Sequence, residues 1–260
     1  MRSAIAMVLL LSAGVAQADA TAQKVLDCVR GNSPASVRVQ DFELQVTEAD
    51  GESRTLAGRL YAQREASGKN AGKMHAMLRV DQPDNLKGAS YLVRETDDYL
   101  RDGMFVYLPS VKRVRRVSGT FADGALLGTS FSYYDFKQIT GAFGDLNAEL
   151  EAATEIGQRP VHVLRFTALP GAETAYSAVR AWIDQKTCLP LQAEFYVGDQ
   201  VRKRMTAKPE AIRTDGDHRY VSELEMRDLS DGLLTRLRIL KVSLGKEVPG
   251  RYFDPNAFHF

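Results

Sequence analysis

Histidines are the residues of this chain whose type is used most often in catalysis and metal binding. His75, His162, His218 and His259 each stand alone, without a second histidine or a cysteine at the spacing of a metal site. The sequence also lacks the Gly-x-Ser-x-Gly turn of a serine nucleophile and the glycine-rich motifs that hold phosphates or dinucleotides. We therefore expect a protein that is not an enzyme and that carries no metal and no cofactor.

A run of basic residues is the strongest local charge feature, and it consists of Lys112, Arg113, Arg115 and Arg116. On a strand, Arg113 and Arg115 share one face while Lys112 and Arg116 lie on the other. Such a ribbon suits contact with an acidic partner or with anionic lipid headgroups. The plainer alternative is a solvated edge strand whose positive charge discourages aggregation through strand pairing.

Residues 119–144 interrupt the regular pattern of the chain with aromatic side chains among five glycines. An irregular segment of this length inside a compact sheet is usually functional or serves as a cover. Its aromatic residues can form a flap over an apolar cavity or a plug at the end of the sheet, and both arrangements bury the same residue types. The side chains that we expect to line or cover a ligand site are Leu126, Leu127, Phe131, Tyr133, Tyr134 and Phe136.

The beginning of the chain has the layout of a secretory signal peptide. Arg2 supplies positive charge, residues 4–11 are apolar, and small residues flank candidate cleavage positions at Ala18 and Ala20. The apolar run is shorter than the roughly 20 residues that a spanning helix needs. We predict a signal peptide over residues 1–20, a single β domain over residues 21–260 without a transmembrane segment, and a location in the periplasm. The near balance of 34 basic and 33 acidic residues argues against a nucleic-acid partner.

Cys28 and Cys188 are the two cysteines of the chain. An exported protein meets an oxidising compartment, where a pair of cysteines favours a disulfide over two buried free thiols. The bridge would tie the start of the mature chain to a distant strand. In the chain-entropy model, closing so long a loop contributes on the order of 5 kcal/mol of stability.

Apolar and polar residues alternate along most of the mature chain, as in half-buried strands. Turn dipeptides such as Asp50-Gly51 and Asp231-Gly232 separate these runs. Residues 22–29 have helical spacing instead, and Gly31 is a natural helix stop. The pattern predicts a mainly β protein with a few helices, built on a strongly curved or partly closed antiparallel sheet. Strands are expected over residues 42–46, 56–62, 74–80, 104–108, 111–118, 161–166, 179–184 and 191–197.

Three segments of the chain resemble the outer-membrane lipoprotein-sorting protein family, a LolA-like group. Residues 105–118, FVYLPSVKRVRRVS, are similar to the strand pair that is typical of this family. Residues 128–136, GTSFSYYDF, and the hairpin from Trp182 to Leu191 resemble two further motifs of it. The resemblance extends over most of the mature chain, although the cysteine pair is not part of the pattern.

The resemblance implies a curved, incompletely closed antiparallel β-barrel of the LolA/LolB type. In that fold helices and loops cover the mouth, and the apolar cleft receives acyl chains. We therefore expect a periplasmic carrier that binds a lipid, an acyl chain or a lipoprotein for transfer toward the outer membrane. Arg115 and Arg116 are then candidates for contact with headgroups or a partner. Because the resemblance also implies a link with RND-type (MMPL-like) exporters, the alternative is a non-catalytic periplasmic accessory subunit of such an exporter.

Overall fold

The computed structural model describes residues 13–32, 37–141, 146–171, 174, 176–216, 218–245 and 248–260. The predicted signal peptide falls largely outside these residues and stays a prediction. The first helix, α1, covers Ala13–Gly31. It ends at the predicted glycine but begins before residue 22, where the helical spacing had suggested its start.

The described strands form one large antiparallel sheet and one separate hairpin. The first and last strands of the sheet pair in its middle, because β1 lies between β2 and β15. Two meanders, one on each side, therefore make up the sheet. From edge to edge it consists of β6 (Arg113–Val117), β5 (Gly103–Leu108), β4 (Ser90–Arg94), β3 (Met74–Gln82), β2 (Ser53–Arg64), β1 (Arg38–Thr47), β15 (Leu234–Leu244), β14 (Glu223–Asp228), β11 (Gln200–Ala207), β10 (Pro190–Val197), β9 (Ala178–Asp184), β8 (Arg159–Ala168) and β7 (Leu146–Ile156). The separate hairpin pairs β12 (Ile212–Asp215) with β13 (His218–Val221).

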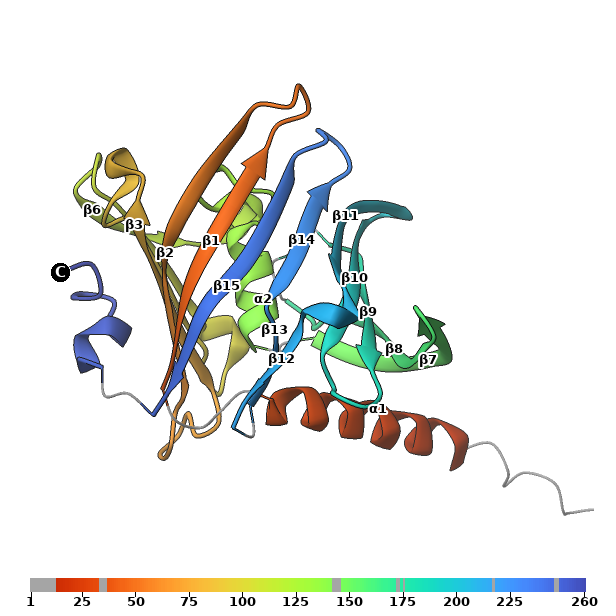
Figure 1. Ribbon diagram of the computed structural model, residues 1–260. Coiled ribbons are helices and arrows are strands. Elements are labelled where there is room, and N and C mark those ends of the chain that lie inside the picture. The colour runs from red at the N-terminus through yellow and green to blue at the C-terminus, as the bar shows by residue number, and fades with distance from the viewer. Residues whose placement is uncertain are drawn as a thin grey trace, which may run out of the picture.

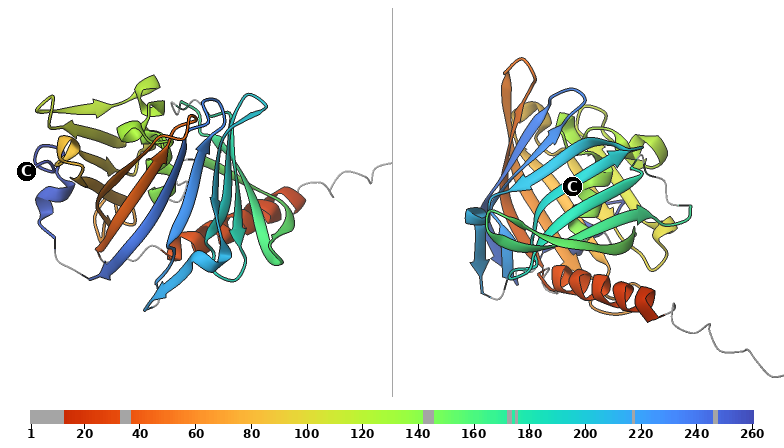
Figure 2. Two further views of the ribbon diagram at one scale, coloured as in Figure 1. Left: turned by 45° about the horizontal axis from the view of Figure 1, so that its top comes forward. Right: turned by 90° about the vertical axis from the view of Figure 1, so that its right-hand side faces the viewer.

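The sheet curves strongly around a hollow, as Figure 1 and Figure 2 show. Its two edge strands, β6 and β7, do not pair with each other, so the sheet stays open rather than closing into a barrel. A bulge in the pairing of β2 with β3, beside Gly58, contributes to the bend. Strands β2 and β3 approach so closely there that a Cβ at position 58 would overlap the carbonyl oxygen of Arg79, which explains the glycine. The predicted mainly β fold with an incompletely closed antiparallel sheet is confirmed.

Residues 119–141 differ from the irregular flap or plug that the glycines suggested. Two 3-10 turns, Gly119–Asp123 and Leu126–Gly128, lead into a helix, α2, over Tyr133–Gly141. Reciprocal hydrogen bonds start this helix, because the Ser132 amide donates to Asp135 Oδ2 over 2.7 Å and the Asp135 amide donates to Ser132 Oγ over 3.0 Å. Figure 1 places α2 in the hollow of the sheet. Further 3-10 turns cover Asp84–Leu86, Tyr99–Arg101, Pro209–Ala211 and Gly250–Phe253.

Each face of the sheet has its own apolar core. The inner face, toward the hollow, packs against α1 and α2 through buried residues that include Leu26, Phe131 and Tyr134. The outer face of the β1–β5 half is covered by the C-terminal segment, from which Phe253 and Phe258 are buried. Because strand side chains alternate between faces, the same strands supply both cores.

Candidate functional site

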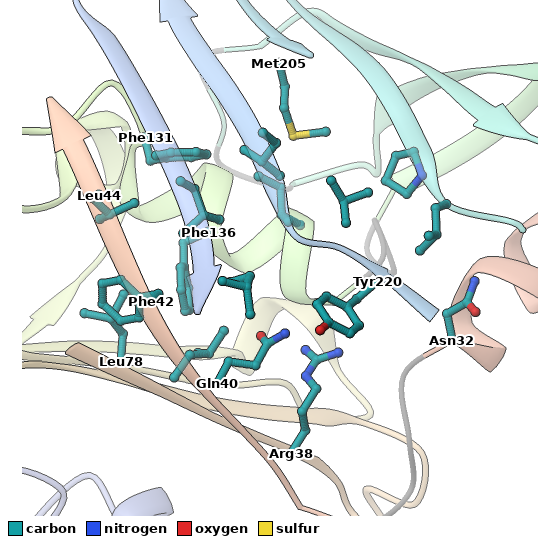
Figure 3. Close-up of a pocket in the computed structure, with 18 of the residues that line it drawn as sticks. Asn32, Arg38, Gln40, Phe42, Leu44, Leu78, Phe131, Phe136, Met205 and Tyr220 are labelled. Atoms are coloured by element: carbon teal, nitrogen blue, oxygen red, sulfur yellow. The ribbon is translucent and has the colours of Figure 1, made fainter. Parts of the chain in front are cut away.

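A cavity of about 230 Å³ lies on the inner face of the sheet. Strands β1 and β15 form one wall, α2 lies opposite, and the end of α1 and the hairpin β12–β13 bound it below (Figure 3). Its apolar lining residues include Phe42, Leu44, Leu60, Leu78, Leu126, Phe131, Phe136, Ile139, Met205, Leu224, Leu237 and Ile239.

Strand β1 lines the cavity with polar side chains at its start and apolar side chains further along. Arg38, Gln40, Phe42 and Leu44 are alternate residues of this strand, so all four project to the inner face and line the cavity. The wall therefore changes from polar to apolar along a single strand. Figure 3 shows Arg38 and Gln40 at one end of the cavity and Leu44 with Phe131 toward the other.

We call Asn32, Arg38, Gln40, His218 and Tyr220 the polar end of the cavity. They come from the end of α1, the start of β1 and the hairpin strand β13. Figure 3 shows Arg38, Gln40 and Tyr220 pointing toward the same end of the cavity. Donor groups from three separate elements thus converge on one end of an otherwise apolar space.

Arg38 carries a charge that no described carboxylate balances. Its Nε is buried and has no hydrogen-bond partner among the described residues. Burial, reinforced by the like charge of Arg64, lowers the pKa of Arg38 to about 10, so the guanidinium is still protonated at neutral pH. The Arg38 side chain as a whole is half-buried, and a charge that is partly shielded from water without a partner is costly to the folded protein.

His218 is 5% exposed, and neither of its ring nitrogens has a hydrogen-bond partner among the described residues. Burial, together with the nearby charge of Arg38, lowers the pKa of this histidine, although the Asn32 carbonyl and Asp215 act in the opposite direction. Its ring stacks on that of Tyr220 with 5.6 Å between the centroids. A neutral imidazole can donate one hydrogen bond and accept another, and the Asn32 carbonyl can take up only the donor, so the acceptor nitrogen remains available.

The disulfide predicted between Cys28 and Cys188 is present. It joins α1 to the turn between β9 and β10, and the residues that follow the two cysteines, Val29 and Leu189, both line the cavity. The Asn32 side chain adds a hydrogen bond of 2.8 Å to the Thr187 carbonyl. The end of α1 is therefore fixed beside the polar end by a covalent bond and a hydrogen bond.

Buried ion pairs hold α2 in the hollow. Asp135 is fully buried and accepts hydrogen bonds of 2.8 Å from Lys203 Nζ on β11 and from the Tyr176 hydroxyl. On the other side, Lys137 Nζ lies 2.9 Å from Asp102 Oδ2 with both side chains about 6% exposed. Burial and the Asp135 carboxylate raise the pKa of Tyr176, which therefore stays a hydrogen-bond donor.

The structure brings three of the six predicted ligand-site residues to the cavity, namely Leu126, Phe131 and Phe136. The other three are not among its lining residues. Tyr133 packs edge-on against Tyr91 and accepts a hydrogen bond from the Tyr91 hydroxyl at its carbonyl, while Tyr134 lies against Tyr176. Leu127, with a φ of 53°, is partly buried against the inner core.

The predicted basic strand is β6, at one edge of the sheet. Lys112, Arg113 and Arg115 are exposed there, and Arg116 donates a hydrogen bond of 3.2 Å to the Asp102 carbonyl. None of these four side chains lines the cavity. The expected position at an edge of the sheet is confirmed, while both roles of the charges, protection against strand pairing and contact with a partner or a headgroup, stay predictions.

Sequence reasoning missed Arg38, Gln40, His218 and Tyr220. Arg38 and Gln40 had a usable signal, because they extend the alternation of Phe42, Leu44 and Val46 toward the start of the strand. His218 had none, since its position depends on how the β12–β13 hairpin folds back against α1 and β1.

A family model described as "Uncharacterized protein" matches residues 72–259, well over half of the chain. The chain belongs to this family. No curated protein matches its sequence. The match includes the three segments on which the resemblance rests, but it begins after strand β1 and its polar-end residues.

Solved structures of similar proteins extend the likeness to the whole fold. A DUF1329 family protein from Desulfovibrio piger has 19% identity and a TM-score of 0.83, with 92% of this chain and 98% of that chain covered. A domain described as an outer membrane lipoprotein-sorting protein, from Vibrio parahaemolyticus, has 18% identity and a TM-score of 0.81, covering 93% and 100%. A LolA superfamily protein from Nitrosomonas europaea has 18% identity and a TM-score of 0.70, covering 89% and 96%. The resemblance to LolA-like proteins is confirmed at the level of the fold.

Two further features bear on the site. Among the helices in the described ranges, none combines the length and apolarity that crossing a membrane requires. Within the same part of the chain, no group of three or more histidine, cysteine or acidic side chains is arranged to hold a metal ion.

Proposed function

We propose that this protein is a periplasmic carrier that holds one acyl chain of a lipid or lipoprotein in the inner cavity during transfer toward the outer membrane. The observation that carries the proposal is the cavity itself, an apolar space of about 230 Å³ between α2 and the inner face of an open LolA-type sheet. An apolar wall with a few convergent polar groups is typical of a site that binds a small amphiphilic molecule.

The energetics of such a carrier follow from the lining. Each methylene moved from water into an apolar environment contributes about 0.8 kcal/mol, so a single chain binds well without any specific polar contact. Release requires that the wall open. Helix α2 forms part of the wall through Phe136 and Ile139, and its displacement would expose the chain to water.

The size of the cavity limits the cargo in this conformation. Pockets for drug-sized ligands are typically about 300–1,000 Å³, and this cavity of about 230 Å³ lies below that range. It suits one chain or part of one chain. A cargo with several acyl chains would require α1 or α2 to move away from the sheet, or would leave its other chains outside.

Native mass spectrometry of the protein purified from periplasm, with lipid extraction of the same sample, tests the proposal. We expect a stoichiometric adduct that bears an acyl chain and disappears when Phe136→Asp places a charge in the cavity. Ile239→Trp, which fills the cavity with an apolar side chain and so favours a folded protein, should also remove the adduct. Phe121→Asp is the matched control, because Phe121 is 52% exposed in the segment before α2 and should leave the adduct unchanged.

A protein that carries no adduct, and that takes up no phospholipid, fatty acid or lipopeptide on incubation, would overturn the proposal. The exporter-subunit function would then be the better account. It is favoured by exposed Lys112, Arg113 and Arg115 on the unpaired edge of the sheet, where an acidic segment of a partner could add a strand. Its test is binding of the wild-type protein, but not of a Lys112→Glu/Arg113→Glu/Arg115→Glu variant, to the periplasmic domain of an RND-type transporter.

A further inference from the structure

No structural contact among the described residues explains why a charged side chain, Arg38, lies at the polar end of the cavity. Elsewhere on the inner face, the buried charged groups around α2 form ion pairs, as in Lys203 with Asp135. Arg38 forms no ion pair among the described residues, and the charge that contributes to the shift of its pKa belongs to another cation, Arg64. A half-buried cation whose Nε is shielded from water and that has no counterion lowers stability, so its presence at the end of a cavity calls for a ligand that supplies the counterion.

We propose that Arg38, Gln40 and His218 form a headgroup subsite that binds the anionic end of a single-chain lipid, a carboxylate or a phosphate, while the chain lies along Phe42 and Leu44. This inference rests on the proposed function and specifies its ligand. The alternation of β1 places the subsite and the chain site on the same face in sequence order. A linear amphiphile has the same order of polar and apolar parts.

The donors available at this end match an anionic oxygen group. The guanidinium of Arg38 supplies up to five N–H donors, and its Nε is without a partner. His218 contributes a ring nitrogen, and the Gln40 amide, at the same end of the cavity, contributes a further donor (Figure 3). Carboxylates and phosphates accept such charge-assisted hydrogen bonds, often in pairs from one guanidinium.

A neutral headgroup would not satisfy this end. An alcohol or ester oxygen can accept a hydrogen bond from Arg38, but it leaves the positive charge uncompensated in a partly dry site. A zwitterionic headgroup would bring its own cation close to Arg38 and Arg64, which both carry positive charge. The site therefore selects a net anionic group on one chain.

Titration calorimetry on protein stripped of co-purified lipid tests the subsite. The probes are dodecanoate, dodecyl phosphate and dodecanol, each below its solubility or micelle limit, and inorganic phosphate alone. We expect both anionic chains to bind roughly 10- to 100-fold more tightly than dodecanol, which is the range for hydrogen bonds to a charged group. Inorganic phosphate should bind far more weakly than dodecyl phosphate, because it lacks the apolar contacts.

Matched variants separate the subsite from the rest of the cavity. Arg38→Met should weaken the two anionic chains roughly 10- to 100-fold and leave dodecanol unchanged, while Arg38→Lys should retain part of the preference. Arg59→Met is the control, because Arg59 lies on the same sheet at 54% side-chain exposure beside Asp41 and Asp81. It should change none of the affinities.

The two proposals fail in different ways. If the three chains bind equally and Arg38→Met alters none of them, the headgroup subsite is overturned while the acyl-chain carrier stands. If no chain binds, the carrier itself is overturned, and the subsite with it. If inorganic phosphate binds as tightly as dodecyl phosphate in an Arg38-dependent way, the site takes a free anion and both lipid proposals are wrong.

Discussion

Two regions on the inner face of the sheet hold charged side chains that are shielded from water, and these regions differ in pairing among the described residues. Around α2, Asp135 meets Lys203 at 2.8 Å and Lys137 meets Asp102 at 2.9 Å. At the polar end of the cavity, Arg38 has no carboxylate partner among the described residues. The paired charges hold a helix in place, whereas the unpaired one costs stability, and our proposal accounts for it by the binding of an anionic ligand. Burial of charge is thus structural in one region and, in our proposal, functional in the other.

The largest effect is expected from Lys203→Met. It leaves the Asp135 carboxylate buried without its cation, which should lower the free energy of unfolding by about 3–5 kcal/mol. Urea unfolding followed by circular dichroism measures the change. Lys208→Met, at an exposed position just after the same strand, should be close to neutral. The double variant Lys203→Met/Asp135→Asn should recover part of the loss, and a single variant as stable as wild type would show that this pair does not anchor α2.

Removal of the disulfide should have the next largest effect. Cys28→Ser/Cys188→Ser opens a link between residues 160 positions apart, and losses of about 2–5 kcal/mol are typical for native disulfides. Amide hydrogen exchange shows which elements lose protection. We expect faster exchange in the end of α1 and in β12–β13, next to the polar end, and unchanged protection in α2. Equal loss of protection in α2 would mean that the two regions are not independent.

Arg38→Met tests the comparison through the sign of its effect. Without ligand, replacing an uncompensated, half-buried cation by an apolar side chain should stabilise the protein, by on the order of 1 kcal/mol. The same Met substitution at Lys203 is destabilising, so the two variants move the urea midpoint in opposite directions. A loss of stability in Arg38→Met comparable to that of Lys203→Met would indicate that Arg38 is a structural residue after all.

The smallest effect concerns pH and His218. Because burial lowers the pKa of His218 below its ordinary value of 6.5, the unfolded chain takes up a proton at a higher pH than the folded one. The neutral, buried His218 therefore contributes its full share to the stability of the fold above pH 6.5. This share is lost as the pH falls from 6.5 through the lowered pKa of the folded protein. His218→Gln should therefore lose less stability than wild type between about pH 7.5 and about pH 5.5.

Other groups set the background for that measurement. Arg38 opposes protonation of His218 while Asp215 favours it, and the Tyr220 ring stacks on the imidazole. The pKa of His75 is also lowered by burial, so some acid sensitivity should persist in the variant. His162→Gln on β8 serves as the control. If wild type and His218→Gln lose stability identically as the pH falls, His218 is not a source of the acid sensitivity.

Much of the fold could be predicted because strands carry their own signal. The alternation of Phe42, Leu44 and Val46 reflects burial on one face, and it identified β1 without any knowledge of its neighbours. The edge position of β6 agrees with one of the two interpretations of its charges, since exposed arginines are tolerated where one side of the strand faces water. Helix α2 was missed although Ser132 and Asp135 form a capping pattern, because the surrounding glycines suggested a loop.

The cavity could be predicted only in part, because pairing between distant segments creates it. Strand β1 meets β15, with Phe42 opposite Ile239, and the hairpin that carries His218 comes from a third part of the chain. No local pattern records these contacts. The aromatic segment illustrates the limit, since Phe131 and Phe136 face the cavity whereas Tyr133 and Tyr134 between them pack into the core. Phe131 precedes helix α2, and on the helix itself Tyr133, Tyr134 and Phe136 point in different directions.

A crystal structure with ω-bromododecanoate would test the central claim most directly, because the bromine marks one end of the chain by its anomalous scattering. The account predicts the carboxylate at Arg38 and the bromine near Phe131 and Met205, at the opposite end of the cavity (Figure 3). A bromine beside Arg38, or a chain bound only outside the cavity, would contradict it.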